Sequence, residues 1–511
     1  MSAGGGTALT RRSFVKGAAA AAAAPWVPRS RHPRWTIPPV EPQDVPLYDL
    51  EVWQAADLIR RRIVSPVELA EATLERIAET EPWIETFVNQ YPADEIMARA
   101  EAAEDEIAAG RYLGPLHGIT VGLKDIYLTE GKVTEGNSGL YQGFTPSFDA
   151  TSVARLKAAG AVIVGKAGTS ELATADQWPA KNPWDFDRVA GGSSTGSATG
   201  VAASQFMVGM GTCTGGSIRG PAANCGITGL KPTYGAISLH GVLPLAWSMD
   251  HPGPMVHSAR DAALVLDAVG GEDPLDPHTR KVARYRTAEA LFREPRPNPL
   301  ERVVVGVPAE DDFLMGVPND EQLGAFGEAV EVMRSLGATV RTVRTNVLFP
   351  GLTSLSSFYL IIRSAEVGAY QRHNLLTQPD NMSEAYRSRV ASGVLMPGHA
   401  YVQAQRVRRH WRDRFLTVFD ECDALIHPAD DIAGLVEGED PPRPRESTGS
   451  KTNMWNLSGA PAVAIPTGFS EAEGMPLSMQ VAAAPGRDEI ALIVADAFQQ
   501  VTEHHRARPA L

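Results

Sequence analysis

The 511-residue chain contains only three cysteines, Cys213, Cys225 and Cys422, and they lie far apart or unpaired in the sequence. They are too few for a disulfide framework and lack the paired spacing of a zinc site. The adjacent His504 and His505 would point in different directions on a helix. We therefore expect no metal site.

Positive charge and long apolar runs are also scarce. The chain has 47 Lys and Arg against 60 Asp and Glu, which gives a formal net charge of −13. Nucleic-acid binding needs clustered basic residues, so we expect no nucleic-acid partner. The basic run at 406–414 is interpreted as the exposed face of a helix. No stretch approaches the roughly 18 continuous apolar residues of a membrane span.

The N-terminus carries a pair of arginines, Arg11 and Arg12, within "TRRSFVKGAAAAAAAPWVP" at 10–28. The pair is followed by a phenylalanine, a lysine and an alanine run, which resembles a twin-arginine export signal. The alternative is an alanine-rich linker. We predict a signal peptide over residues 1–24 and a periplasmic or extracellular protein without stable membrane association after export.

The remaining chain has the composition of a soluble globular protein, with 43% hydrophobic and 21% charged residues. Residues 25–48 are rich in proline and polar side chains, which predicts an extended N-terminal arm. Residues 49–511 contain no internal repeat and no convincing linker. We therefore predict a single domain over 49–511.

Helical and strand-like patterns alternate along this domain. Ser65 is a candidate N-cap, Pro66 occupies the first helical position and Glu68 completes a capping box. Further helices are predicted at 93–110, 150–160, 196–205, 350–415 (mainly helical) and 487–505. Strands are predicted at 118–125, 161–167, 206–212, 424–428, 462–468 and 477–483. This alternation predicts an α/β protein with a mostly parallel sheet.

Two neighbouring segments, "GGSSTGS" at 191–197 and a longer one at 211–235, are crowded with glycine and small hydroxyl residues. Neither has the GxxxxGKS/T or GxGxxG pattern of a nucleotide loop, and the acidic charge weakens a phosphate site further. Glycines also let backbone N–H groups converge on a developing alkoxide. We therefore expect an oxyanion hole at "TGGS", 214–217, beside the Ser217 hydroxyl.

A nucleophilic serine needs a base, and neither segment contains a histidine. The nearest histidines, His117 and His240, carry no supporting motif. Lys124 instead ends an apolar strand, where burial would lower its pKa and allow it to lose its charge. Neutral Lys124 would then accept a proton relayed through Ser193.

Three segments carry a specific resemblance: "GPLHGITVGLKD" at 114–125, 181–203 around "GGSSTGS", and 211–235 around "GTCTGGS". They are similar to the blocks of the amidase signature family of Ser–Ser–Lys hydrolases. The 24-residue gap between Ser193 and Ser217 fits that family. Further matches reach from 65 to 483 and weaken over 240–450. The resemblance implies a large mixed, mostly parallel central sheet covered by helices on both faces.

Carried over by position, the resemblance makes Ser217 the nucleophile of an acyl-enzyme that water hydrolyses. Ser193, held on a cis peptide bond, would shuttle protons, and Lys124 would be the base and later the proton source. Ser194 would make supporting hydrogen bonds, while Lys166 and Lys231 are interpreted as structural. No metal or organic cofactor is implied. The oxyanion hole would be formed by the N–H groups of Thr214, Gly215, Gly216 and Ser217.

Two positions depart from the family pattern. Cys213 stands where the family usually has an aspartate, and Thr195 stands where it usually has glycine. The aspartate would pair with Arg219, so this arginine needs another acceptor, because an unpaired buried charge is costly. A thiol beside Arg219 would have a lowered pKa. The simpler interpretation is that Cys213 is a small buried side chain.

These observations lead us to expect an exported amidase cleaving carboxylic amides, including aryl amides or esters. A carbamate hydrolase on the same site is the nearest alternative. An amidotransferase A-type subunit is opposed by the export motif, and a non-catalytic binding protein is motivated only by Cys213. The expected partner is a small-molecule amide, ester or carbamate. A homodimer is compatible with the sequence, although no residue specifies one.

Substrate preference is not determined by these motifs. Phe358, Tyr359 and Tyr370 are candidates to line a pocket for an apolar acyl or aryl group. They are equally compatible with a helix core. Residues 137–144, after the lysine strand, are a further candidate wall.

Overall fold

The computed structural model assigns the described residues to one compact unit, Trp35–Leu511. The predicted signal peptide at 1–24 and part of the predicted arm lie outside the described residues. The description covers residues 36–42, 45–174, 178–279, 285–293, 296–309, 319–345, 355–429 and 448–511.

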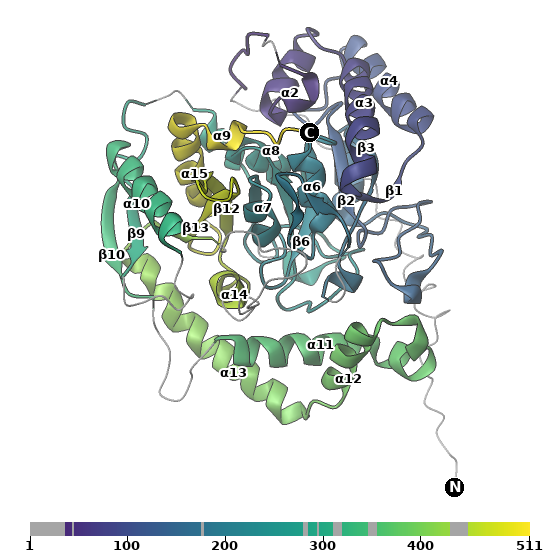
Figure 1. Cartoon of the computed structure of the whole chain (residues 1–511), viewed down its shortest axis with the longest axis vertical. Helices are drawn as coiled ribbons and strands as arrows, with labels where there is room; N and C mark the ends of the chain where they lie inside the picture. Colours follow the sequence, from purple (N-terminus) through teal and green to yellow (C-terminus); the bar gives the residue numbers. More distant parts are fainter. Residues whose placement is uncertain are drawn as a thin grey trace. The chain divides into compact units, whose positions relative to one another are not determined.

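An eleven-stranded sheet forms the centre of this unit, in the order β1-β3-β2-β6-β8-β7-β12-β13-β11-β9-β10 (Figure 1). A separate two-stranded sheet joins β4 (Lys181–Asn182) and β5 (Asp185–Val189). The strands of the central sheet are β1 (Phe87–Gln90), β2 (Thr120–Lys124), β3 (Val162–Ala167), β6 (Val208–Cys213), β7 (Thr228–Lys231), β8 (His251–Val256), β9 (Val304–Pro308), β10 (Thr339–Val343), β11 (Ala424–Pro428), β12 (Ala462–Phe469) and β13 (Pro476–Ala483).

The expected large mixed sheet is confirmed. Strands β3, β2 and β6 run parallel to one another, as do β11, β9 and β10. Between these two blocks, from β6 to β11, neighbouring strands pair antiparallel. Because Leu123 of β2 lies opposite Met210 of β6, Lys124 and Cys213 end their strands at the same edge of the sheet.

Helices cover both faces of the sheet (Figure 1). Successive side chains of a strand point to opposite faces, and every residue is buried in β2, β3, β6, β7, β8, β11 and β13. Short 3₁₀ turns η1–η7 lie at Leu47–Asp49, Gly139–Tyr141, Glu171–Ala173, Pro277–Thr279, Pro379–Asn381, Leu416–Asp420 and His504–Arg506. The helices are α2 (Val52–Arg60), α3 (Pro66–Ile84), α4 (Ala93–Ala108), α5 (Thr151–Ala158), α6 (Thr195–Ala202), α7 (Arg219–Asn224), α8 (Ala259–Val269), α9 (Thr287–Leu291), α10 (Asp320–Ser335), α11 (Leu355–Thr377), α12 (Glu384–Val394), α13 (Gly398–Phe415), α14 (Thr448–Ser458) and α15 (Asp488–Thr502).

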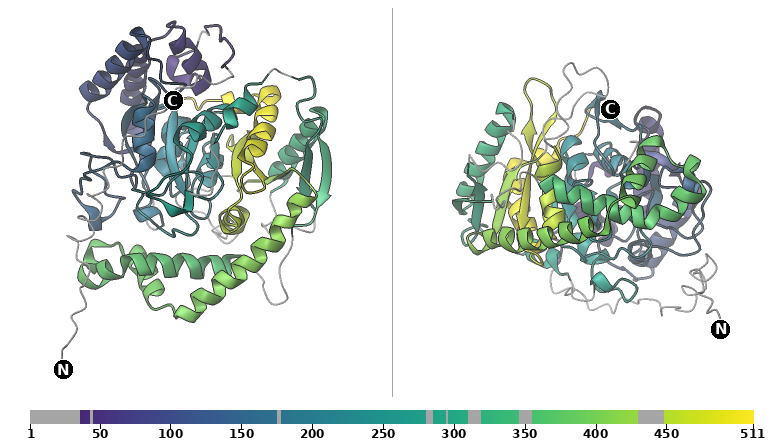
Figure 2. Two further views of the ribbon diagram at one scale, coloured as in Figure 1. Left: turned by 180° about the vertical axis from the view of Figure 1, so that it is seen from behind. Right: turned by 90° about the horizontal axis from the view of Figure 1, so that it is seen from below.

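Three of these helices, α11, α12 and α13, lie together beyond one end of the strands, where Figures 1 and 2 show them in green. Helix α14 contacts both α11 and α13. The described part of the segment expected to be mainly helical, 355–415, thus forms a layer. Helix α14 links this layer to the sheet, because Trp455 donates to His427 of β11 and Asn456 donates to the Cys213 carbonyl of β6.

Helix α6 consists of small residues because other parts of the chain approach its backbone closely. A Cβ atom added to Gly196 would lie 2.3 Å from the carbonyl oxygen of Thr86. One added to Gly200 would lie 2.1 Å from the ring of Phe206. The helix therefore packs against its neighbours at distances that larger side chains would prevent.

The described part of the N-terminal arm contacts α2. Residues 36–42 have no regular secondary structure, yet Ile37 and Val40 are buried. The backbone N–H of Val40 donates to the Asp57 carboxylate over 2.8 Å. These contacts fix this stretch on the helix.

The basic run at 406–414 lies on α13, but the interpretation as an exposed face is wrong for two of its residues. Arg408 donates to the carbonyl oxygens of Leu457 and Ser248, each over 2.9 Å. Trp411 is fully buried. The guanidinium group of Arg408 thus satisfies carbonyl groups that would otherwise lack a donor.

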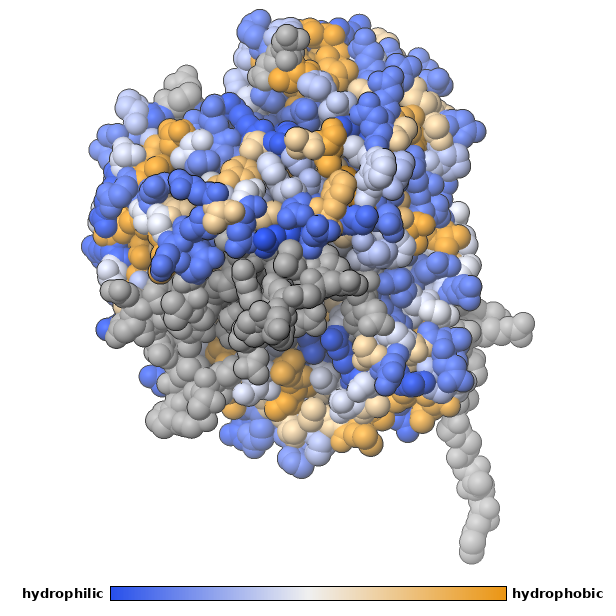
Figure 3. Space-filling view, in the orientation of Figure 1, coloured by the Kyte–Doolittle hydropathy of each residue, from blue (hydrophilic) through white to orange (hydrophobic). Residues whose placement is uncertain are grey.

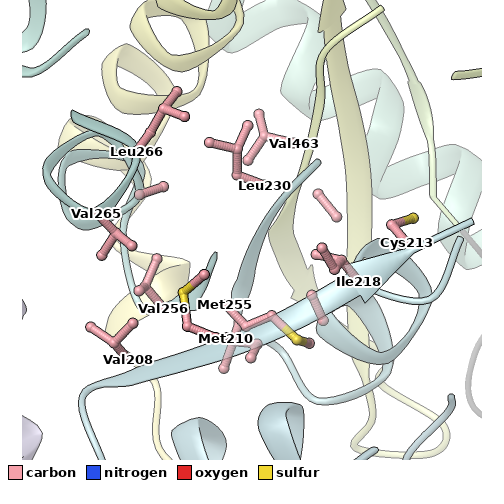
Figure 4. Close-up of a cluster of buried hydrophobic side chains, with 14 of the residues drawn as sticks. Val208, Met210, Cys213, Ile218, Leu230, Met255, Val256, Val265, Leu266 and Val463 are labelled. Carbon is pink, nitrogen blue, oxygen red and sulfur yellow. The ribbon is translucent and has the colours of Figure 1, made fainter. Parts of the chain in front are cut away.

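Within the described ranges, no helix is both long and apolar enough to cross a membrane. On the face shown in Figure 3, hydrophobic residues are scattered among hydrophilic ones. The large apolar side chains instead gather around the central sheet, as in the cluster of Figure 4.

The N-terminus of α3 offers a test of a local prediction. Ser65 accepts from the N–H of Glu68, and the Glu68 carboxylate accepts from the N–H of Ser65. Replacing Ser65 by Ala is expected to lower the free energy of unfolding by about 1 kcal/mol, since one N–H loses its acceptor. Urea denaturation would measure this. Glu71→Ala, on the exposed side of the same helix, is the control, and equal stability losses would contradict the capping role.

Candidate active site

Lys124, the last residue of β2, is completely buried and surrounded by hydroxyl groups. Its Nζ atom donates to Ser193 Oγ over 2.8 Å, to Thr212 Oγ1 over 2.9 Å and to Ser194 Oγ over 3.1 Å. The structure therefore joins the lysine to Ser193 and Ser194. Thr212 was not identified from the sequence as a partner of Lys124, although it lies within the motif "GTCTGGS" at 211–217.

Burial lowers the pKa of Lys124 to about 7, because the charged ammonium group would lose its hydration. Negative charge on Cys213 and Asp250 opposes this effect. A recess lined by Thr212, Thr214, Asp250 and several apolar side chains is too narrow for a water molecule. Near neutral pH, the amine can thus exchange a proton with its hydroxyl partners.

Ser193 and Ser194 lie directly before α6 and face the end of β6. The Gly192–Ser193 peptide bond is cis, the geometry that the family resemblance implies. The Ser193 carbonyl accepts from the N–H of Ser170 over 3.1 Å. Ser194 Oγ donates to the Thr212 carbonyl and accepts from the Thr212 N–H, each over 3.2 Å. Ser194 thereby holds the serine segment to the strand that precedes residue 214.

The segment 214–217 leaves β6 and exposes part of its backbone. In the described part of the chain, no acceptor takes the N–H groups of Gly215, Gly216 or Ser217. Buried N–H groups are nearly always paired. Consecutive unpaired donors in a partly buried segment are suited to stabilise an oxyanion.

Ser217 is half-buried, and its hydroxyl makes no hydrogen bond to any described residue. The structure therefore brings Lys124 and Ser193 together but leaves the link from Ser193 to Ser217 open. Catalytic hydrogen bonds often tighten only when substrate is bound. The catalytic roles of these three residues remain predictions.

Asp250 is a further residue of the site that the sequence did not indicate. Its buried carboxylate accepts from the Thr214 hydroxyl over 2.6 Å and from the N–H groups of Leu245 and Ala246. Burial raises the pKa of Asp250 to about 6. The residue lies in 240–450, where the family resemblance weakens. An acidic residue directly before an apolar strand was the only signal.

Arg219 has found other acceptors in place of the missing aspartate. The side chain is 1% exposed, and Nη1 donates to Gln480 Oε1 over 2.8 Å. Nη2 donates to the Thr452 carbonyl over 2.8 Å and to Asn456 Oδ1 over 2.7 Å. Cys213 Sγ lies 3.5 Å from Nη2. Among the residues described, none of the acceptors of Arg219 is a carboxylate.

Cys213 is buried at the end of β6, near Ile218 (Figure 4). Burial alone would raise the pKa of this thiol. The charge and hydrogen bond of Arg219, the N–H of Ile218 and the charge of Lys231 instead lower the pKa below its ordinary value. By contrast, burial raises the pKa of Cys422 to about 12. Cys213 therefore occupies an electropositive environment rather than a merely apolar one.

The two other lysines near the motifs make structural contacts, as interpreted from the sequence. Lys166 donates to the Tyr127 carbonyl and the Thr134 hydroxyl, and its Nζ lies 3.4 Å from the Asp125 carboxylate. These contacts fix the loop that follows Lys124 in the chain. Buried Lys231 donates to the carbonyl of its neighbour, Pro232, over 3.0 Å.

The candidate lining residues separate into three environments. Tyr359 is buried with its hydroxyl against Gly215, where an added Cβ would lie 2.2 Å from that oxygen. Phe358 packs on α13 and belongs to the core. Tyr370 is 42% exposed, and its hydroxyl lies 3.4 Å from that of Tyr141, within 137–144. Tyr359 contacts the site directly, and Tyr370 contacts the second candidate wall.

Side chains able to bind a metal do not gather in the described part of the chain, where no group of three or more His, Cys, Asp or Glu is suitably placed. His505 is buried 3.4 Å from the Glu51 carboxylate. His504 instead lies against the ring of Phe498. The adjacent histidines therefore face different neighbours.

Replacing Cys213 by Asp is expected to raise the free energy of unfolding by about 1–2 kcal/mol, because Arg219 would gain a charged acceptor. Guanidinium denaturation at pH 8 would measure the change. Cys225→Asp is the matched control: Cys225 is equally buried, but its thiol contacts the Ala190 carbonyl rather than a cation. Equal destabilisation by both changes would contradict the expected pairing.

Comparison with known proteins supports the resemblance seen in the motifs. Residues 68–492 match the family model described as Amidase. The A subunit of glutamyl-tRNA(Gln) amidotransferase from Geobacter metallireducens is 34% identical over 497 residues, covering 91% of this chain and 100% of the relative. The similarity thus extends over nearly the whole length of both proteins.

Solved structures show the same fold. One, described as an unexpected vestigial protein complex that reveals the evolutionary origins of an s-triazine catabolic enzyme, has a TM-score of 0.80 and 30% identity, covering 90% of this chain and 100% of that chain. The peptide amidase of Stenotrophomonas maltophilia has a TM-score of 0.77 and 26% identity, covering 90% and 98%. The family model, the relatives and the fold agree that this chain belongs to the amidase signature family.

Proposed function

We propose that this protein is a serine hydrolase that cleaves carboxylic amide bonds through an acyl-enzyme on Ser217. One observation carries the proposal: the buried amine of Lys124 donates to Ser193 Oγ over 2.8 Å beside a segment of unpaired N–H groups. We infer that this amine, after losing its proton, is the proton acceptor and that the unpaired N–H groups form the oxyanion site.

The reaction would proceed by two proton transfers in each direction. Neutral Lys124 accepts a proton from Ser193, which takes one from Ser217 as Ser217 Oγ attacks the substrate carbonyl carbon. The N–H groups of Gly215 and Gly216 hold the resulting alkoxide. Protonated Lys124 returns its proton through Ser193 to the departing amine. Water then hydrolyses the acyl-enzyme by the same relay.

Esters would react at the same site more readily, because an alkoxide leaves more easily than an amine. A carbamate hydrolase is the second candidate on this machinery. The aromatic ring of Tyr359, whose hydroxyl lies against Gly215, supports an aryl or apolar group near the acyl carbon.

An amidotransferase component is the main alternative of a different kind, and the name of the 34% identical relative favours it. Such a component would act together with partner chains. The twin-arginine motif at Arg11 and Arg12 supports an exported hydrolase instead, because export would separate the protein from tRNA. Fractionation of cells producing the full-length chain would separate the two: recovery in the cytoplasm alone would favour the amidotransferase.

Ser217→Ala is expected to lower the hydrolysis of every substrate by at least about 10³-fold, because the acyl-enzyme cannot form. Matched anilide, ester and carbamate substrates that share one acyl or aryl group would be assayed with the isolated chain. Their ranking would choose among amidase, esterase and carbamate hydrolase. Ser335→Ala, an exposed serine on α10, is the control. Turnover that survives in Ser217→Ala would contradict the proposal.

The pH dependence follows from the base. Lys124 must be neutral to accept a proton, so kcat/KM is expected to rise as pH increases through about 7 and then level off. Below about pH 6, kcat/KM should fall more steeply with decreasing pH. Asp250 is then protonated, and its carboxylate no longer accepts the hydrogen bond from the Thr214 hydroxyl. Initial rates between pH 5 and 10 would test this. A flat profile would exclude Lys124 as the base, and Lys124→Met should be inactive throughout.

A further inference from the structure

The Gly215–Gly216 peptide lies between two hydroxyl groups that come from distant parts of the chain. Thr452 Oγ1, on α14, donates to the Gly215 carbonyl over 2.5 Å. The Tyr359 hydroxyl, on α11, also lies close to Gly215, where an added Cβ would be 2.2 Å from it. A Cβ on Gly216 would lie 2.4 Å from Thr452 Oγ1, and Gly216 has a φ of +151°. Glycine is required here by close approach, in addition to leaving the N–H groups clear.

The direction of the Gly215 carbonyl determines the direction of the next N–H. A trans peptide unit is planar, with its C=O and N–H groups pointing to opposite sides. Because the Gly215 carbonyl points at Thr452, the N–H of Gly216 must point away from α14. That N–H has no acceptor among the residues that the structure describes. Rotation of the peptide plane would turn both groups together.

Thr452 is itself held by the segment that it orients. Its backbone carbonyl accepts from Arg219 Nη2 over 2.8 Å, and Arg219 lies two residues beyond Ser217. The carbonyl of the next peptide, Gly216–Ser217, accepts from the N–H of Gly220 over 2.8 Å, which ties that following peptide to the start of α7. Thr452 therefore contacts the segment both before and after the predicted nucleophile.

Glycine gives this peptide the freedom to rotate, because the chain has no Cβ atoms at either position to restrict it. An oxyanion donor contributes most when its direction is set before the reaction begins. The Thr452 hydroxyl supplies the restraint that the glycine backbone lacks.

We propose that Thr452 is a positioning residue whose hydroxyl fixes the Gly215–Gly216 peptide so that the Gly216 N–H points at the oxyanion. The proposal rests on the proposed serine hydrolase function. Thr452 touches neither substrate nor the reacting atoms and acts through Gly215. Its effect should therefore fall on the transition state and spare the binding of substrate.

Thr452→Val removes the donor and keeps the shape, whereas Thr452→Ser keeps the donor. Thr452→Val is expected to lower kcat by about 10- to 100-fold with KM nearly unchanged, somewhat less than the loss of a complete oxyanion donor. Thr452→Ser should remain within about threefold of the parent protein. Equal losses in both variants, or none in Thr452→Val, would overturn the proposal.

A second measurement separates positioning from general damage. A trifluoromethyl ketone carrying the acyl group of the best substrate forms a tetrahedral adduct with a nucleophilic serine. Thr452→Val should weaken this inhibitor by the same factor as kcat/KM. Substrate affinity should be equal in Ser217→Ala and in Ser217→Ala with Thr452→Val. Loss of substrate affinity in the double variant would overturn the proposal.

A third measurement does not depend on activity. Crystal structures of the parent protein and of Thr452→Val should show the Gly215–Gly216 peptide turned in the variant. An unchanged peptide would overturn the role of Thr452 even if the protein hydrolysed no substrate. Absence of turnover in the parent protein, with a turned peptide in the variant, would instead contradict only the proposed hydrolase function.

Discussion

The hydrogen bonds of the buried Lys124 amine are the interactions on which the rest of the site depends. The hydrogen-bond partners of this amine are three neutral hydroxyl groups rather than a carboxylate. The nearby charges of Cys213 and Asp250 raise the pKa of Lys124, but burial outweighs them. The pairing of β2 with β6 brings those hydroxyls within reach, because the parallel register places Lys124 beside Thr212. A carboxylate in place of any of these hydroxyls would restore the ordinary charge of lysine and prevent the role of base that we propose for it.

Charge around the segment 213–219 is balanced in an unusual way. Arg219 and Lys231 are both buried near Cys213, and the acceptors of Arg219 are amide and carbonyl oxygens together with a thiol. Buried cations are stabilised by several oriented dipoles as well as by anions. Both Nη atoms of Arg219 find such acceptors, whereas its Nε has none among the described residues. Asn456 contributes most, since its Oδ1 accepts from Arg219 while its Nδ2 donates to the Cys213 carbonyl over 2.7 Å. The side-chain amide thus performs part of the bracing expected of the absent aspartate.

The motifs predicted much of this arrangement, because the relevant residues lie close in sequence within glycine- and serine-rich segments of distinctive pattern. The capping box of α3 and the strand ending at Lys124 follow from local rules, and both are present. Asp250 and Thr452 could not be predicted in the same way. Thr452 contacts Gly215 across 237 positions of the chain, and a lone threonine in a polar stretch has no local signature. Arg408 shows the same limit, since a basic run does not reveal which arginine turns inward.

Tyr359 gives α11 two tasks at once. The Tyr359 hydroxyl lies against Gly215. Farther along the same helix, Tyr370 contacts Tyr141 of the 137–144 segment at the surface. A helix that contacts both Gly215 and the surface segment 137–144 cannot shift without moving the backbone of the proposed oxyanion site. Evolution of a new substrate range would therefore be expected to exchange exposed side chains on α11 and in 137–144 one at a time.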